Sequence, residues 1–244
     1  MVKFTAMKPL DITKKYALPF LFGILLLGGS CTKDYFVNGG TADPHYDGSI
    51  YDYLANNPYY LDTVAWVVAH SSYKEILEKD SVTFFSFTDD AIRQAMDDLN
   101  DVRYYNVEDS VHLEDIPPEV WDHFLGMYIM RGRHLAKDFA RVDPLNIYAY
   151  PGINYVMYNG YVMNIGLLYQ DYNGVEAVGA RILQLTDITY DPTNFRNNSS
   201  IRVASSDIQP VNGVLHVLNN HNIFGFRGGE FARVAEQNLV ARGK

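Results

Sequence analysis

The stretch Val82-Thr83-Phe84-Phe85-Ser86-Phe87-Thr88-Asp89-Asp90-Ala91-Ile92 holds the clearest local pattern in this chain. Its first six residues are β-branched or aromatic except for Ser86, a composition typical of a buried strand. Thr88 follows directly and two acidic residues come next, which is the pattern of a helix N-cap and of a first turn that suits the helix dipole. The stretch therefore predicts a central, buried strand that runs straight into a helix capped by Thr88.

Downstream of this stretch the sequence predicts mainly β-strands. Residues 155–163 contain an Asn-Gly pair between alternating apolar residues, which indicates a hairpin because Asn-Gly accepts the positive φ of a type I′ turn. Further strands are predicted over 178–185, 201–204 and 213–218. The segment 228–244 reads as a weak helix with basic residues.

Upstream of the central strand the sequence predicts helices. Ser49, with Asp52 three residues later, forms a capping-box pattern. Residues 61–68 place apolar side chains at helical spacing and predict a second helix. Ser72 and Glu75 repeat the capping-box pattern and predict a third, short helix.

Two segments lie between the helical half and the β-strand half. Residues 100–118 are polar and acidic and predict a loop, whereas residues 120–128 place apolar side chains on one helical face. Helices first and strands afterwards predict an α+β protein and not an alternating βαβ one.

The N-terminus has the pattern of an export signal. Lys14 and Lys15 precede the uncharged, apolar segment 16–30, which is shorter than the roughly 20 residues of a membrane span. The single cysteine of the chain, Cys31, follows at once, after Gly-Gly-Ser. This arrangement resembles a bacterial lipobox, so residues 1–30 are predicted to be a lipoprotein signal peptide. Residues 31–48, rich in glycine and aspartate, are predicted to be a tether that is lipidated at Cys31. An uncleaved N-terminal anchor or a buried thiol is the alternative interpretation of the same residues.

Two segments resemble the signatures of the fasciclin (FAS1) family. Residues 82–92 resemble the first, and Pro210-Val211-Asn212-Gly213-Val214-Leu215-His216-Val217-Leu218 resembles the second. Residues 124–132 resemble the passage between them. The resemblance implies a FAS1 domain over 49–226, a β-sandwich or wedge with helices packed on it, followed by a C-terminal tail over 227–244. The residues that match the family signatures, and to which the resemblance gives a structural role, are Phe85, Thr88, Asp89, Ala91, Tyr128, Asn212, Gly213 and His216.

The chain departs from the family pattern at two positions. Phe87 stands where the first signature usually has proline, and Tyr128 is followed by Ile129 where the family usually has histidine. That Tyr-His pair is linked to receptor adhesion in animal members, so integrin-like binding is not implied here. The family has no shared active site, and its members act in adhesion and in matrix or glycan binding.

Charge and motif content exclude several classes of function. The net charge of −9 and the lack of a Lys/Arg cluster argue against nucleic acid as a partner. The sequence contains no Gly-x-Ser-x-Gly elbow and no glycine-rich phosphate loop. His216 and His221 lack the spacing of metal ligands on one face, and His216 is interpreted as a structural histidine. We therefore expect no enzyme activity, no cofactor and no metal.

The expected function is that of a binding module outside the inner membrane. Thr32, in place of aspartate after the cysteine, resembles lipoproteins that are sorted to the outer membrane, on either its periplasmic or its cell-surface face. The expected partners are the membrane, through the lipid anchor, and an extracellular protein or glycan. The alternative is an accessory glycan-binding lipoprotein of a polysaccharide uptake system, with exposed aromatic residues around 155–172 as its binding surface.

Overall fold

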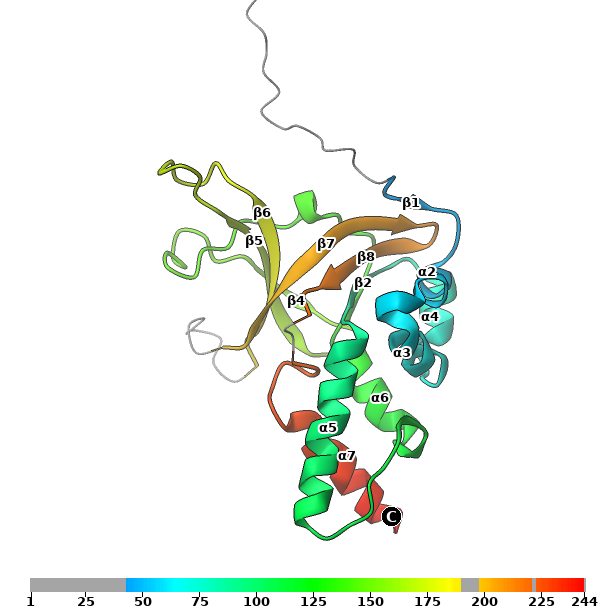
Figure 1. The fold of residues 1–244 in the computed structure, drawn as a ribbon. Coiled ribbons are helices and arrows are strands. Elements are labelled where there is room, and N and C mark those ends of the chain that lie inside the picture. The colour runs from blue at the N-terminus through cyan, green and yellow to red at the C-terminus, as the bar shows by residue number, and fades with distance from the viewer. Residues whose placement is uncertain (1–42, 190–197, 221–222, 244) are drawn as a thin grey trace, which may run out of the picture. The chain divides into compact units, whose positions relative to one another are not determined.

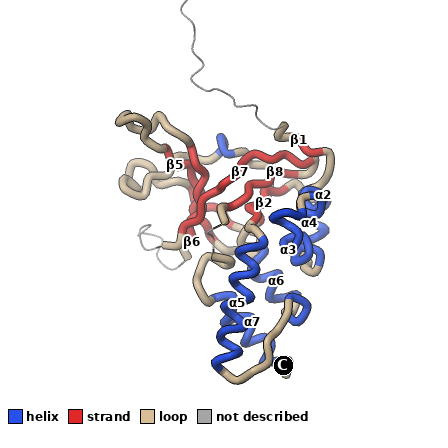
Figure 2. The backbone as a smooth tube through the Cα atoms, viewed as in Figure 1, coloured by secondary structure: helices blue, strands red, loops and turns tan. Residues whose placement is uncertain are grey.

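The computed structural model describes residues 43–189, 198–220 and 223–243, which belong to one compact unit that begins at Asp43. The predicted signal peptide and Cys31 lie outside the described residues. The α+β class predicted from the sequence is confirmed, because helices pack on a large mixed sheet (Figures 1 and 2).

The described strands form one eight-stranded sheet in the order β3-β2-β8-β7-β6-β5-β4, with β1 beside β7. The pairs β2–β8 and β1–β7 are parallel, and the other pairs are antiparallel. The strands are β1 (His45–Tyr46), β2 (Val82–Ser86), β3 (Ile129–Arg131), β4 (Ile153–Val156), β5 (Val162–Tyr169), β6 (Arg181–Asp187), β7 (Ser200–Pro210) and β8 (Gly213–Leu218).

The two ends of this sheet approach each other. The backbone N–H of Tyr158, just after β4, donates to the carbonyl of Ile129 in β3 at 2.8 Å. The sheet therefore curls toward a closed barrel at this point, which leaves less free strand edge for unwanted pairing.

The helices form two groups around the sheet (Figure 1). The first group follows β1 and lies beside β2 and β8, and the second lies against the other end of β2. The first group is α2 (Ile50–Asn56), α3 (Pro58–Ala69) and α4 (Lys74–Lys79), and the second is α5 (Asp89–Tyr105), α6 (Pro118–Leu125) and α7 (Glu230–Ala241).

Local sequence explains where the first helices begin. Ser49 and Asp52 form the predicted capping box at the start of α2. Pro58 occupies the first turn of α3, where its missing N–H costs no hydrogen bond. The capping box predicted at Ser72 is wrong. Tyr73 is the N-cap of α4, and the Ser72 N–H donates to Asp122.

Two further predictions differ from the structure. The helix α5 extends to Tyr105, so the loop predicted from residue 100 begins later. The apolar face of α5 continues past Leu99 because the aliphatic part of Arg103 is buried among its neighbours.

The hairpin at 155–163 exists, but only Gly160 has a positive φ, 85°. The link from β4 to β5 is therefore a five-residue loop closed by the Met157–Tyr161 hydrogen bond, not a type I′ turn.

The folded unit is also longer than the predicted boundaries of 49–226. β1 pairs with β7, so residues that were assigned to the tether take part in the sheet. The predicted tail forms α7, which buries Phe231 and Leu239 against the second helical group. Both ends were misassigned because their partners are far away in the sequence.

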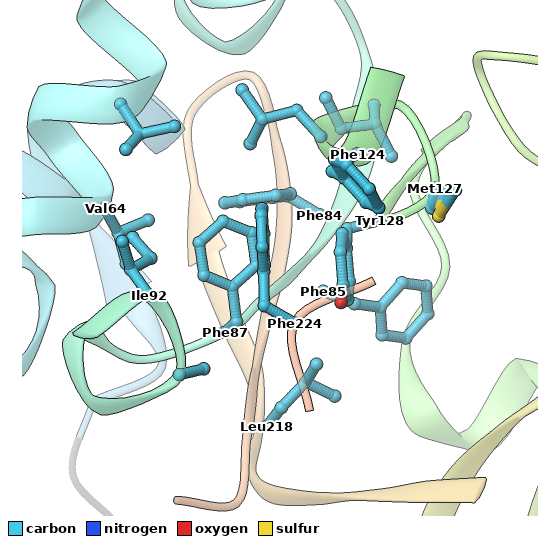
Figure 3. Packing of buried hydrophobic residues seen from close by; sticks show 14 of the residues in the cluster. Val64, Phe84, Phe85, Phe87, Ile92, Phe124, Met127, Tyr128, Leu218 and Phe224 are labelled. Carbon is cyan, nitrogen blue, oxygen red and sulfur yellow. The ribbon is translucent and has the colours of Figure 1, made fainter. Parts of the chain in front are cut away.

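The core lies where β2, α6 and the segment before α7 meet (Figure 3). Phe87 packs edge-on against Phe224 at 4.7 Å between ring centroids, and Tyr128 stacks on Phe226 at 5.1 Å. The buried Tyr128 hydroxyl accepts a hydrogen bond from the Gly225 N–H at 2.8 Å. Burial raises the pKa of this hydroxyl, so it stays protonated at neutral pH.

Candidate functional site

A groove of about 490 Å³ opens between the α2–α3 corner and the strands β7 and β8. We refer to it as the α2–α3 groove. Its volume falls in the range of roughly 300–1,000 Å³ that is typical of small-ligand sites. One wall consists of Tyr53 and residues 56–61. The other wall consists of Ala204, Ser205 and Ile208 from β7 and Val217 and Leu218 from β8, and Thr88 and Asn220 complete the lining.

Two consecutive tyrosines stand out at this groove. Tyr59 is 83% exposed and Tyr60 is 54% exposed, and their rings meet edge-to-face at 4.4 Å between centroids. They are exposed because α3 turns its other side inward, where Leu61 and Val64 are buried. The proline at the start of α3 holds the corner that presents them.

Amide side chains surround the tyrosines. The Asn56 Nδ2 donates to the Tyr46 hydroxyl at 2.8 Å, and the Asn57 Nδ2 donates to the Tyr53 carbonyl at 2.7 Å. Each amide is thereby fixed through its nitrogen. Their Oδ1 atoms accept no hydrogen bond from the described residues and are available to a ligand that donates one.

The described residues that line the groove include no charged side chain. Two carboxylates, Asp62 and Asp89, directly follow the lining residues Leu61 and Thr88 in the sequence. Asp89 accepts backbone hydrogen bonds from Val64 at 3.0 Å and from Asp62 at 3.2 Å. Burial, followed by a hydrogen bond with Asp62, raises the pKa of the Asp89 carboxyl from 3.8 to about 6. The hydrogen bond to Asp89 lowers the pKa of Asp62 in turn. Asp89 therefore joins α5 to α3.

The predicted aromatic surface over 155–172 is mostly engaged within the protein. Tyr155 packs edge-on against Phe139, and Tyr158 packs against Tyr73. Tyr169 lies between two guanidinium groups, at 5.1 Å from Arg141 and 4.7 Å from Arg181. Of the tyrosines expected there, Tyr172 is strongly exposed, at 62%. The open tyrosine pair lies at 59–60, which sequence reasoning missed, although a Tyr-Tyr pair just after an Asn-Asn-Pro corner could have indicated it.

Most of the signature residues are buried, Asp89 and Asn212 are partly buried, and of the eight only Thr88 lines the groove. Phe85 and His216 are register partners on β2 and β8, and their rings stack at 5.2 Å. His216 accepts a hydrogen bond from the Asp207 N–H at Nδ1, and its Nε2 lies 3.0 Å from the His134 carbonyl. Burial lowers the pKa of His216, which keeps the ring neutral. Ala91 is buried at the start of α5.

Thr88 occupies the N-cap position of α5, as the sequence predicts, but without a side-chain hydrogen bond. Its hydroxyl oxygen is buried and has no partner among the described residues. The expectation of a side-chain cap at this position is therefore wrong.

Asn212 and Gly213 close the sheet next to the first helical group. The Asn212 Oδ1 accepts from the Ile50 N–H at 2.8 Å, and its Nδ2 donates to the carbonyls of Leu77 and Asp80. The φ angle of Gly213 is not positive. A Cβ here would overlap the carbonyl oxygen of Val82 and lie 2.6 Å from the Ile50 Cδ1. Glycine is needed at this position for close approach, not for its φ angle.

Two further features of the described residues bear on function. In residues 43–189, 198–220 and 223–243, no group of three or more His, Cys, Asp or Glu side chains is placed to hold a metal ion. None of the helices in this described part of the chain combines the length and the apolar character that a membrane span requires.

Solved structures are similar to this chain, among them a FAS1 domain pair from the insect cell adhesion molecule Fasciclin I. The TM-score is 0.45 and the sequence identity is 12%. The similarity covers 70% of this chain and 49% of that chain, so this chain spans about half the length of the solved domain pair. No protein-family model and no curated protein matches the sequence.

Proposed function

We propose that this chain is a lipoprotein of the outer membrane whose single fasciclin-like domain binds an extracellular protein or glycan and catalyses no reaction. The observation on which this rests is the α2–α3 groove, where an exposed tyrosine pair stands beside fixed amides. Tyrosine provides a large, rigid contact area with a polar tip, which suits a wet binding surface.

The non-catalytic part of the proposal is supported by the state of His216. Both of its ring nitrogens lie within hydrogen-bond distance of backbone groups, and the residue is fully buried. A general base must reach a substrate proton, which His216 cannot do from this position.

The proposed anchor is Cys31, at the end of the predicted signal peptide. Metabolic labelling with a fatty-acid analogue should mark the wild-type chain, and Cys31→Ala should abolish the label because the acceptor sulfur is gone. Ser30→Ala, which keeps the cysteine and a small residue before it, serves as the control and should retain the label. A label that persists on Cys31→Ala would refute the lipoprotein assignment.

The second candidate function is an accessory glycan-binding lipoprotein of an outer-membrane polysaccharide uptake system. The amides around Tyr59 and Tyr60 favour it, since side-chain amides suit ligands rich in hydroxyl groups.

One experiment tests the binding function for either kind of ligand. The full-length chain is applied to an array of glycans and to an array of extracellular proteins, together with the double variant Tyr59→Ala/Tyr60→Ala. We expect a ligand on at least one array and weaker binding by the variant. The matched control is Tyr104→Ala/Tyr105→Ala, a second consecutive and exposed tyrosine pair that lies outside the groove. Equal losses in the two double variants would contradict a role for the groove.

A further inference from the structure

We infer that the α2–α3 groove is a site for a neutral oligosaccharide, with one sugar ring packed on Tyr59 and sugar hydroxyls donating to the Oδ1 atoms of Asn56 and Asn57. The inference rests on the proposed binding function and deepens it by naming the class of ligand and the residues that contact it.

The aromatic contact comes from the way Tyr59 is held. The Tyr60 ring meets Tyr59 edge-on at 4.4 Å, so it supports the Tyr59 ring from the side while 83% of the Tyr59 surface stays open. Sugar rings present a flat patch of C–H groups that packs well on an aromatic face. Because a tyrosine side chain has only two rotatable χ angles, such a contact costs little conformational entropy.

The polar contacts come from the two asparagines at the corner. Asn56 and Asn57 are each fixed through their Nδ2 atoms by bonds to Tyr46 and Tyr53. Each amide keeps its acceptor oxygen and its second N–H for a ligand, and sugar hydroxyl groups, which both donate and accept, match these groups. Asn220 and Ser205 also line the groove and can both donate and accept.

The charges argue for a neutral ligand. The described lining residues carry no cationic side chain that could pair with a sulfate or a uronate. Asp89 and Asp62 flank Thr88 and Leu61, and the chain as a whole has a net charge of −9, so an anionic glycan would be repelled. A cationic ligand is not favoured either, because both oxygens of Asp89 already accept backbone hydrogen bonds.

The strands at the groove disfavour an extended peptide as the occupant. A peptide would gain most of its affinity by adding a strand to a free sheet edge. Here β8 is paired with β2 and β7, and β7 is paired with β8 and β6. β8 offers no free edge, and the part of β7 that β6 and β1 leave unpaired, residues 203–208, carries two register shifts toward β8. Such a bulged edge is a poor template for strand addition, so recognition by side chains is favoured.

The test is isothermal titration of the full-length chain with four neutral hexaoses (of the cello, xylo, manno and malto series) and with polygalacturonate as the anionic probe. We expect binding of at least one neutral hexaose and none of polygalacturonate. Tyr59→Ala should weaken the binding about tenfold or more, as the loss of one stacked ring implies. Tyr104→Ala, an equally exposed tyrosine outside the groove, should bind as the wild type does.

The outcomes separate this inference from the proposed function. Both substitutions lie on the surface, so equal melting temperatures are expected and a loss of binding cannot be attributed to unfolding. Preference for polygalacturonate, or a neutral hexaose that binds Tyr59→Ala as well as the wild type, would overturn the inference. A protein ligand that depends on Tyr59, with no hexaose bound, would also overturn it while leaving the proposed function intact. No ligand of either class would contradict both.

Discussion

Gly213 and Asn212 show how single residues set the junction between the sheet and the first helical group. Asn212 satisfies three backbone groups, at Ile50, Leu77 and Asp80, which would otherwise need other partners. Gly213 lets β8 approach β2 without a side chain between them.

Gly213→Val should destabilise the protein strongly, because the new side chain would overlap the Val82 carbonyl and the Ile50 side chain. Gly228→Val is the matched control, since no heavy atom lies within 4 Å of a Cβ at Gly228 and its φ is not positive. Thermal melts of the two variants measure the difference. Equal melting temperatures would show that the close approach at Gly213 is not needed for the fold.

Thr88→Val should leave the free energy of unfolding unchanged or raise it by about 1 kcal/mol, because it removes a buried hydroxyl that has no partner. Phe85→Ala, also in the segment 82–92, should lower it by about 3–5 kcal/mol, because it leaves a cavity beside His216. Chemical denaturation of both variants tests this contrast. A clear loss of stability in Thr88→Val would mean that the hydroxyl caps α5 after all.

At the scale of elements, α7 completes the second helical group. Phe231 stacks on Trp121 of α6 at 5.2 Å, and Glu236 pairs with the buried Arg103 of α5 at 2.9 Å. The helix therefore closes a core that its neighbours leave open, and the ion pair satisfies a buried charge.

Truncation after residue 227 should therefore prevent stable folding, since it exposes the faces of α5 and α6 and leaves Arg103 without Glu236. Removal of residues 243–244 is the control and should leave the melting temperature unchanged, because α7 ends at Ala241. Melting curves and protease resistance of both truncations check this. A truncated chain that melts like the wild type would show that α7 is a dispensable tail.

The contact between α3 and α5 should depend on pH through Asp89. Its pKa is about 6 in the fold against 3.8 as an isolated group, so the folded state binds the proton more tightly between these values. This contribution to stability is present below about pH 4 and is lost as the pH rises through 6. The stability of the wild type relative to Asp89→Asn should therefore fall between pH 4.5 and 7.

Urea denaturation of the wild type and Asp89→Asn across this pH range measures the difference. His216, whose pKa is lowered by burial, adds a pH dependence of the opposite sign in both proteins and cancels from the comparison. A difference that does not change with pH, or that grows as the pH rises, would contradict the assignment of the raised pKa to Asp89.

At the scale of the molecule, the sheet and both helical groups share one hydrophobic core in the described residues. Helix content followed by circular dichroism and the environment of the buried Trp121 followed by fluorescence should therefore report one transition in urea. Midpoints that differ between the two probes would mean that the core around Trp121, in the second helical group, unfolds separately from the other helices.

The sequence by itself determined the elements whose signals are local. The strand at 82–86, the capping box at Ser49 and the hairpin around Gly160 follow from neighbouring residues, because side-chain periodicity, caps and turns act over a few positions. The α+β class followed from the order of these elements along the chain.

The tertiary structure alone decided what depends on distant partners. It placed residues 45–46 in the sheet and the predicted tail in the core, and it brought the corner at 56–61 against β7 and β8 to form the groove. It also decided why glycine is needed at position 213, because Val82 and Ile50 approach it closely only in the folded protein. Strand pairing and helix docking join segments more than a hundred residues apart, and no local pattern records which segments will meet, because the burial that drives them is not directional.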